Sequence, residues 1–309
     1  MNNKYLSLLQ ETLEEKGFAV TAELGPPKSA DAEVVRKKAD ILSGCVTAAN
    51  ITDNQTAVVR LSSIAAAALI LDKNIEPLIQ IVCRDRNRLA IQADILGAAA
   101  LGIKNVLCLT GDHQQFGNHP RARGVFDMDS IQLIQMLKRM RDDKIFACGD
   151  EIRNGKKEPI VEPKLFIGAA ANPFGDPFEA RVSRLAKKVK AGAQFIQTQP
   201  VFDIDRFAKW MDGVRARGLD KQTHILAGVM PVRSFRAFSY MNKNVPGISI
   251  PDSLVERMKN AEVPKEEGIQ LCVDMIEQVR QIDGVPGVHI MAVEWEACVP
   301  EIVEKAGLK

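Results

Sequence analysis

The sequence lacks paired cysteines, long apolar runs and a leader segment, and each absence excludes a class of protein. Its six cysteines are scattered without a CxxC pair, which disfavours a disulfide framework. The longest apolar run, residues 64–71, is far too short to span a bilayer. The amphipathic, acidic amino terminus has no signal-peptide core. We therefore expect a cytoplasmic protein that does not contact membranes.

An excess of one charge and the common catalytic motifs are also missing. The 41 basic and 39 acidic residues are spread along the chain and give a net charge of +2, so nucleic acid is not an expected partner. Four histidines without HExxH-type spacing predict no bound metal, and His224 and His289, at strand starts, are expected to be structural. No GxSxG motif, Walker motif or convincing Ser-His-Asp order occurs, which disfavours nucleophilic hydrolysis.

What the sequence does contain is an unbroken alternation of apolar runs and helical patterns. The runs expected to be strands are residues 18–24, 46–54, 77–85, 104–112, 165–173, 194–202, 223–232 and 287–296. The helical patterns begin near Asp31 and then cover 58–70, 87–102, 130–143, 178–192, 205–218, 234–242 and 298–307. Near-continuous apolar strands joined by helices predict a parallel sheet covered by helices. Eight such units favour a (β/α)8 barrel, a single domain over residues 1–309.

A doubly wound open sheet is the alternative fold. It needs a glycine-rich turn after the first strand, and the GPPK there (25–28) has the wrong chemistry for cradling phosphate. Three segments exceed a minimal barrel. Loop 113–129 is expected to be a lid or a ligand contact, polar stretch 149–163 a surface excursion, and 265–283 an extra helix.

Polar residues at the strand ends are expected to line one rim, because the carboxyl ends of barrel strands converge on one face. Seven of the eight strands contribute such a group, which packing alone does not require. These residues are Glu23, Thr52, Gln80, Asp112, Asn172, Gln199, Glu294 and Glu296.

Glu23 and Asp112 are the candidate catalytic residues. A carboxylate at the edge of an apolar barrel is partly desolvated, which raises its pKa and suits it to general-acid chemistry. Gly111, directly before Asp112, permits close approach by a flat ligand. Each acid also has a structural interpretation, as an exposed rim residue or a cap. Two carboxylates on one rim nevertheless favour acid chemistry beside a fixed charge.

Amide and basic side chains complete the candidate site. Gln199 and Asn172 can donate and accept hydrogen bonds at once, which suits the edge of a pterin or flavin ring, although turn hydrogen bonding also explains them. Spacings of three and four place Arg181, Arg184 and Lys188 on one helix face. A solvated charged face and a diphosphate contact are both compatible with this pattern.

Six motifs in series resemble the methylenetetrahydrofolate reductase family. They are AELGPPK, ANITDN, LTGD with a long loop ending in VFDMDS, GAAANP, KKVKAGAQFIQTQPVFD and GVMPVRS. They span about residues 18–235, with a weaker match to the end. Within that family the chain resembles the short bacterial enzymes, including those of acetogens that work beside a second subunit.

This resemblance implies a flavoenzyme that reduces 5,10-methylenetetrahydrofolate to 5-methyltetrahydrofolate by reversible hydride transfer from flavin N5. It implies bound FAD, with FMN as the alternative, and an oligomer acting in one-carbon metabolism, methionine biosynthesis or acetogenesis. In the implied ping-pong sequence, NAD(P)H or a reduced redox partner reduces the flavin before the folate stacks on it. The need for a second subunit stays open.

The resemblance also assigns residues. Glu23 matches the general acid that assists opening of the methylene-folate ring, Asp112 matches the carboxylate near flavin and folate, and Gln199 matches the glutamine on the pterin. The implied flavin contacts are Thr52, Gln80, Thr110, Gly111, Asp112, Phe126, Ala170, Asn172, Arg184, Lys187 and Lys188.

Three positions depart from the family pattern. Gln80 stands where a relative has histidine. Met241 replaces a phenylalanine that packs on the substrate, and Glu296 replaces an arginine for the folate tail. The expected substrate-binding set is therefore Gln199, Met241 and Glu296, and the tail site and the electron donor stay open.

Two other functions are compatible with the sequence. A pterin-dependent methyltransferase or synthase barrel would use no flavin, and the colour of the purified protein distinguishes it. A non-catalytic subunit would bind flavin or a partner within a larger assembly. Folate oxidation by this chain alone, with an artificial acceptor, distinguishes that case.

Overall fold

Eight parallel strands close into a barrel in chain order in the computed structural model, which describes residues 4–15, 17–245 and 247–308. The strands are β1 (Ala19–Leu24), β2 (Ala48–Ile51), β3 (Glu76–Val82), β4 (Asn105–Leu109), β5 (Phe166–Ala171), β6 (Phe195–Pro200), β7 (His224–Val229) and β8 (Gly287–Ile290). Ala19 of β1 pairs with Gly287 of β8, which closes the ring. The expected (β/α)8 barrel is confirmed, and the open sheet was the wrong alternative.

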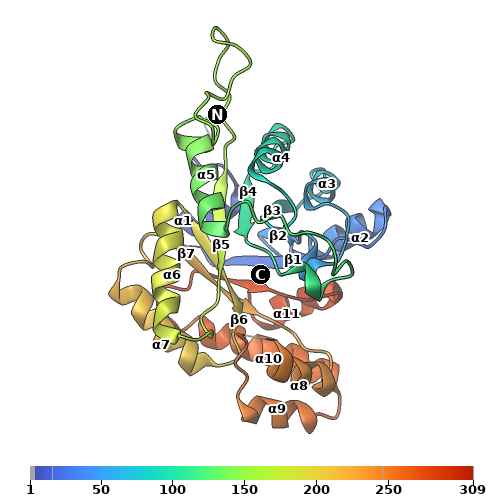
Figure 1. The fold of residues 1–309 in the computed structure, drawn as a ribbon. Helices are drawn as coiled ribbons and strands as arrows, with labels where there is room; N and C mark the ends of the chain where they lie inside the picture. The colour runs from blue at the N-terminus through green and yellow to red at the C-terminus, as the bar shows by residue number, and fades with distance from the viewer. Residues whose placement is uncertain (1–3, 16, 246, 309) are drawn as a thin grey trace.

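Helices cover the outside of this barrel (Figure 1). Those that follow the strands are α2 (Ala32–Leu42), α3 (Ser63–Ala68), α4 (Arg88–Ala100), α5 (Ser130–Asp142), α6 (Phe178–Ala191), α7 (Ile204–Ala216), α8 (Phe235–Asn244) and α11 (Val299–Lys305). Two helix boundaries expected from the sequence carry capping groups in the structure. The Asp31 side chain accepts from the Glu33 N–H at the start of α2, and Gly192 ends α6 with a φ of 119°.

The helical expectations need two corrections. The helix expected over 58–70 spans only Ser63–Ala68, because the preceding chain forms a short 3-10 turn, η1 (Gln55–Ala57), with left-handed backbone. Helix α9 (Asp252–Lys259) is not indicated by the sequence pattern. The extra helix before β8 is confirmed as α10 (Pro264–Val279).

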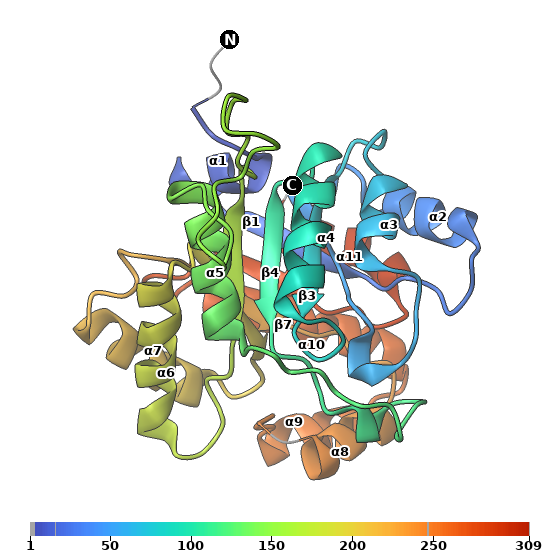
Figure 2. The same ribbon diagram turned by 45° about the horizontal axis from the view of Figure 1, so that its top comes forward.

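The amino-terminal end of the barrel is closed by a helix. Helix α1 (Leu8–Glu14) places Leu9 and Leu13, 0% and 2% exposed, against the buried Leu78, Phe166 and Phe195. Burying one such leucine contributes about 1.5–3 kcal/mol. Figure 2 shows α1 at one end of the barrel, and α8, α9 and the β4–α5 loop at the other. A ligand site is therefore expected at the carboxyl ends of the strands.

Above this apolar plug lies a polar layer inside the barrel. Asn50 Nδ2 donates to Gln197 Oε1 at 2.6 Å and lies 3.3 Å from His289 Nε2. Gln197 Nε2 donates to Thr21 Oγ1 at 3.1 Å, and that hydroxyl lies 3.0 Å from His289 Nδ1. Burial lowers the pKa of His289 to about 3, so its imidazole is neutral at physiological pH. Thr21 precedes Glu23 by two residues, so both side chains lie on the inner face of β1.

Two further expectations agree with the structure, one for a loop and one for the cysteines. The stretch 149–163 is mostly exposed and follows α5 in a projecting loop (Figure 1). All six cysteines are free, and Cys83 and Cys108 are buried as small apolar side chains. Within the described ranges, no helix is both long enough and apolar enough to cross a membrane.

Candidate active site

The strand ends place the expected rim residues at the carboxyl mouth of the barrel, at two different depths. Glu23, Thr52 and Gln80 are buried in it, whereas Asp112 and Gln199 are exposed. The Oγ1 atom of Thr52 is buried without a hydrogen-bond partner among the described residues. A buried polar atom without a partner needs an explanation, and a ligand bound at the mouth would supply one.

Glu23 is the buried acid of this mouth, with 8% of its surface exposed. Burial raises its pKa to about 7. A hydrogen bond from Gln55 and the charge of Arg60 oppose this rise, and the charge of Glu296 adds to it. Near neutral pH the carboxyl is therefore divided between its acid and base forms, as a general acid requires.

The loop after Glu23 is held by an ion pair from distant parts of the chain. Lys38 Nζ lies 2.6 Å from Glu296 Oε1, and both groups are largely buried. Glu296 Oε1 also accepts from the Gly25 N–H at 3.3 Å, and Lys38 Nζ donates to the Gly25 carbonyl at 2.8 Å. The Glu296 carboxylate thus stabilises the β1–α2 loop, and its contact with substrate stays a prediction.

The β4–α5 loop brings Asp112 to the same mouth. Gly111 has a φ of 92°, and a Cβ there would lie 3.0 Å from Arg84 Cβ. Both its backbone conformation and this close contact therefore require glycine. Arg84 Nη1 donates to the Asp112 carbonyl at 3.2 Å, while the Asp112 side chain faces solvent. Thr110 Oγ1 accepts from the Ser130 N–H at 3.1 Å, which ties this loop to the start of α5.

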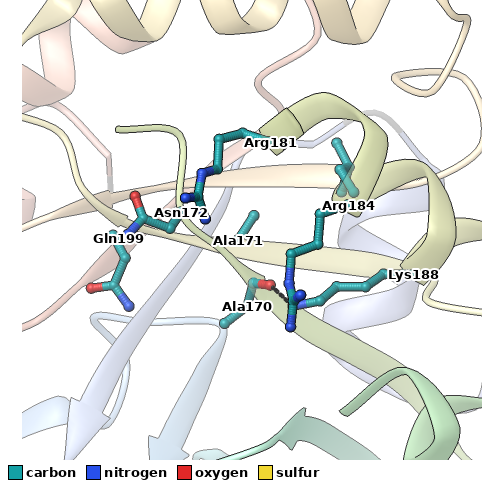
Figure 3. Close-up of a pocket in the computed structure, with 8 residues that line it drawn as sticks. Ala170, Ala171, Asn172, Arg181, Arg184, Lys188 and Gln199 are labelled. Atoms are coloured by element: carbon teal, nitrogen blue, oxygen red, sulfur yellow. Dashed lines mark hydrogen bonds between the residues drawn. The ribbon is translucent and has the colours of Figure 1, made fainter. Parts of the chain in front are cut away.

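A cavity of about 150 Å³ opens beside β5 (Figure 3). It is lined by Ala170, Ala171, Asn172, Arg181, Arg184, Leu185, Lys188 and Gln199. Arg184 and Lys188 extend from α6 toward Ala170, whose carbonyl accepts a hydrogen bond from Lys188. Burial, together with the nearby charge of Arg184, lowers the pKa of Lys188 to about 8. Two adjacent cations in a partly enclosed pocket form a site for an anion.

Asn172 and Arg181 shape the loop above this cavity. Asn172 Oδ1 accepts from the N–H groups of Phe174 and Gly175 at 2.9 and 3.1 Å. Arg181 donates to the carbonyls of Gly175 and Asp176. The turn interpretation of Asn172 is therefore correct as far as its oxygen is concerned, and its amide nitrogen packs closely against Gly247. Its contact with flavin stays a prediction.

The remaining predicted residues, Lys187, Phe126 and Met241, do not line the cavity beside β5. Lys187 is exposed on α6. Phe126 is 37% exposed and its N–H donates to the Cys83 carbonyl just after β3. Met241 packs on the cluster that contains Phe202 and Phe238, on the α8 side of the mouth. Their ligand contacts stay predictions.

Three residues near Glu23 were not identified from the sequence. Gln55 directly follows the ANITDN motif, and only its position offered a signal. Arg60 donates to the Pro26 carbonyl at 3.1 Å and lies 3.3 Å from Glu294. Lys38 pairs with a residue 258 positions away, and no local pattern reports such a contact.

The fold and this mouth define a (β/α)8 barrel with a candidate ligand site at the carboxyl ends of its strands, where β1 carries a buried acid and an anion pocket opens beside β5. The profile of the methylenetetrahydrofolate reductase family matches residues 8–307, and the chain belongs to that family. Methylenetetrahydrofolate reductase 1 of Schizosaccharomyces pombe is 27% identical over 245 residues, which are 77% of this chain and 36% of that protein. The chain thus spans about a third of the length of this curated relative.

Two solved structures are similar in fold. An uncharacterized protein from Clostridium thermocellum that binds two copies of 5-methyl-5,6,7,8-tetrahydrofolic acid has a TM-score of 0.66 at 14% identity, covering 97% of this chain and 100% of that one. A riboflavin lyase with modified FMN and riboflavin has a TM-score of 0.57 at 9% identity, covering 94% and 90%. At these identities the likeness shows the fold alone.

Proposed function

We propose that this chain reduces 5,10-methylenetetrahydrofolate to 5-methyltetrahydrofolate with a bound flavin. Its membership of the family and the names of its curated relatives support the reaction. The observation that carries the proposal is Glu23, a buried carboxyl with a pKa near 7 at the mouth of the barrel. Opening the five-membered ring of the substrate needs a proton donor in a site that excludes water.

The residues at the mouth fit a flavin. Arg184 and Lys188 suit the phosphate groups of a flavin nucleotide, with FAD as the expected form and FMN as the alternative. The unpartnered Thr52 Oγ1 suits a hydrogen-bonding ring at this mouth. Bound flavin would supply hydride at N5 to the one-carbon unit.

The protein's own groups would supply position and charge. Glu23 would give its proton to the nitrogen that leaves the one-carbon unit as the ring opens. Asp112 would balance the resulting iminium cation, and Gln199 would hydrogen-bond the pterin. The fixed loops after β1 and β4 hold the two acids before the substrate arrives. The electron donor, the oligomeric state, a second subunit and a cytoplasmic location stay predictions.

Purification of this chain alone tests the proposal. We expect a yellow protein whose released flavin has the mass of FAD, and oxidation of methyltetrahydrofolate with an artificial electron acceptor. A colourless protein would favour the pterin-dependent methyltransferase class. A yellow protein without folate turnover would favour a non-catalytic subunit.

A further inference from the structure

We propose that Gln55 is a positioning residue for Glu23, and that the β4–α5 loop holds Gln55 in place through contacts with the residues that follow it. The inference rests on the proposed function, in which Glu23 is the general acid. It adds a second residue to the acid and connects the acid to the loop that carries Asp112.

The contact with the acid is direct. Gln55 Nε2 donates to Glu23 Oε2 at 3.3 Å, and within the described ranges it is the only side chain that hydrogen-bonds this carboxyl. A neutral amide can orient a carboxyl without fixing it in the ionised form, which a contacting cation would do. The bond engages Oε2, so Oε1 is left as the oxygen that can carry the proton to a ligand. The neighbouring Arg60 is engaged elsewhere, with Pro26 and Glu294.

The backbone that presents Gln55 is held in an uncommon conformation. Asn54, Thr56 and Ala57 have φ values of 44°, 54° and 57°, a region that costs about 1–2 kcal/mol for each non-glycine residue. Such a conformation persists only where the surroundings fix it. The Asn54 side chain accepts from the Arg60 N–H at 3.0 Å and donates to Asp85 at 3.2 Å, which supplies part of that fixation.

The second support comes from the β4–α5 loop at its 3-10 turn η2 (Gln114–Phe116). Gly117, which follows this turn, lies so close to Ala57 that a Cβ there would overlap the Ala57 carbonyl and lie 2.8 Å from its Cβ. Asn118 Oδ1 accepts from the Val59 N–H at 3.2 Å. Gly117 has a φ of −100°, so alanine would meet a steric conflict with Ala57 without any backbone penalty. The two loops are thus fitted together, and displacement of one moves Gln55.

The first test titrates the Glu23 carboxyl directly, in the full chain and without substrate. Carbon-13 NMR of glutamate-labelled protein, with Glu23→Gln as the subtraction standard, isolates its signal. Gln55→Ala should raise the midpoint by about one pH unit, because the amide stabilises the carboxylate. Gln55→Glu, which keeps the size but adds a second negative charge, should raise it at least as far. The matched control is Gln115→Ala, an exposed glutamine of the β4–α5 loop, which should leave the midpoint unchanged.

The second test follows a single turnover of reduced enzyme with methylene-folate. Gln55→Ala should slow this step roughly 10- to 100-fold and move its alkaline limb to higher pH, while reduction of the flavin by dithionite keeps its rate. Gly117→Ala should change both quantities in the same direction. If wild type and Gln115→Ala show no folate step, the proposed function fails. If they show the step and both Gln55 variants match them in rate and in carboxyl titration, the positioning role of Gln55 is overturned. If Gly117→Ala has the wild-type rate and titration midpoint, the support of Gln55 by the β4–α5 loop is overturned.

Discussion

Glu23, the proposed general acid, destabilises the fold when it ionises, because its carboxyl is buried with one neutral hydrogen-bond donor. Its pKa is about 7 in the folded protein and 4.5 in an unfolded chain, so its contribution to stability is fully present below pH 4.5 and is lost as the pH rises through 7. Glu23→Gln removes this titration. We expect the variant to gain on the order of 2–3 kcal/mol over wild type between pH 4.5 and 8, measured by urea unfolding. Glu304→Gln, at an exposed position, is the control. If the difference in unfolding free energy between Glu23→Gln and wild type were the same at pH 4.5 and pH 8, the raised pKa of Glu23 would be contradicted.

Lys188 allows a second prediction at this scale. Lys188→Ala should weaken flavin retention at least about 10-fold, since a charge-assisted hydrogen bond contributes about 1.5–3 kcal/mol. Because the pKa of Lys188 is lowered to about 8, flavin affinity in wild type should also fall as the pH rises above 8. Fluorescence of released flavin measures both effects. Lys190→Ala, on the exposed side of the same helix, should retain flavin normally, and equal loss in both variants would remove Lys188 from the site.

Single residues were predictable from the sequence where a strand end marked them. Glu23 and Asp112 follow apolar runs, and the structure places both at one mouth. Gln55 and Lys38 were not predictable, because their roles depend on partners brought together only by the closed barrel. Only part of the anion pocket could be predicted. Helical periodicity placed Arg181, Arg184 and Lys188 on one face, but it did not show that Arg181 donates to loop carbonyls.

At the scale of elements, α1 provides a matched pair of leucines. Leu9 is fully buried under the barrel, whereas Leu8 is 53% exposed. Leu9→Ala should lower the free energy of unfolding by about 2–5 kcal/mol, and Leu8→Ala should change it by less than about 0.5 kcal/mol. Urea denaturation measures both. Equal effects would show that α1 does not seal the barrel in solution.

Most elements could be predicted because their apolar periodicity is strong and their ends carry caps such as Asp31 and Gly192. The shortening of α3 could not, because it results from the left-handed turn after Asn54, which contact with Gly117 and Asp85 supports. Sequence periodicity reports which face of a helix is buried, and it does not report such loop-to-loop fitting.

The whole barrel should be sensitive to acid through its internal polar layer. The pKa of His289 is about 3 in the folded protein and 6.5 in an unfolded chain, so stability is present above pH 6.5 and is lost as the pH falls toward 3. This loss approaches about 1.4 kcal/mol per pH unit. His289→Gln should be less stable near pH 7 yet show a flatter decline below pH 6.5, measured by urea unfolding. A variant with the wild-type slope would show that the imidazole is not held neutral.

The closed barrel itself followed from counting eight strand–helix units, which is a property of the whole chain. The internal layer did not follow. Asn50, Gln197 and His289 lie on three different strands, and only closure brings them within hydrogen-bond distance of one another or of Thr21. Sequence patterns therefore predicted the architecture better than the contents of its interior.

In the proposed function, Glu23 donates the proton that accompanies reduction of the folate at this mouth. The most direct test of this role is stopped-flow oxidation of the reduced Glu23→Gln enzyme by methylenetetrahydrofolate. We expect the variant to keep the flavin content and the rate of flavin reduction of wild type, with the folate step slowed by about 10²–10⁴-fold. Oxidation by the folate at a near wild-type rate would contradict it.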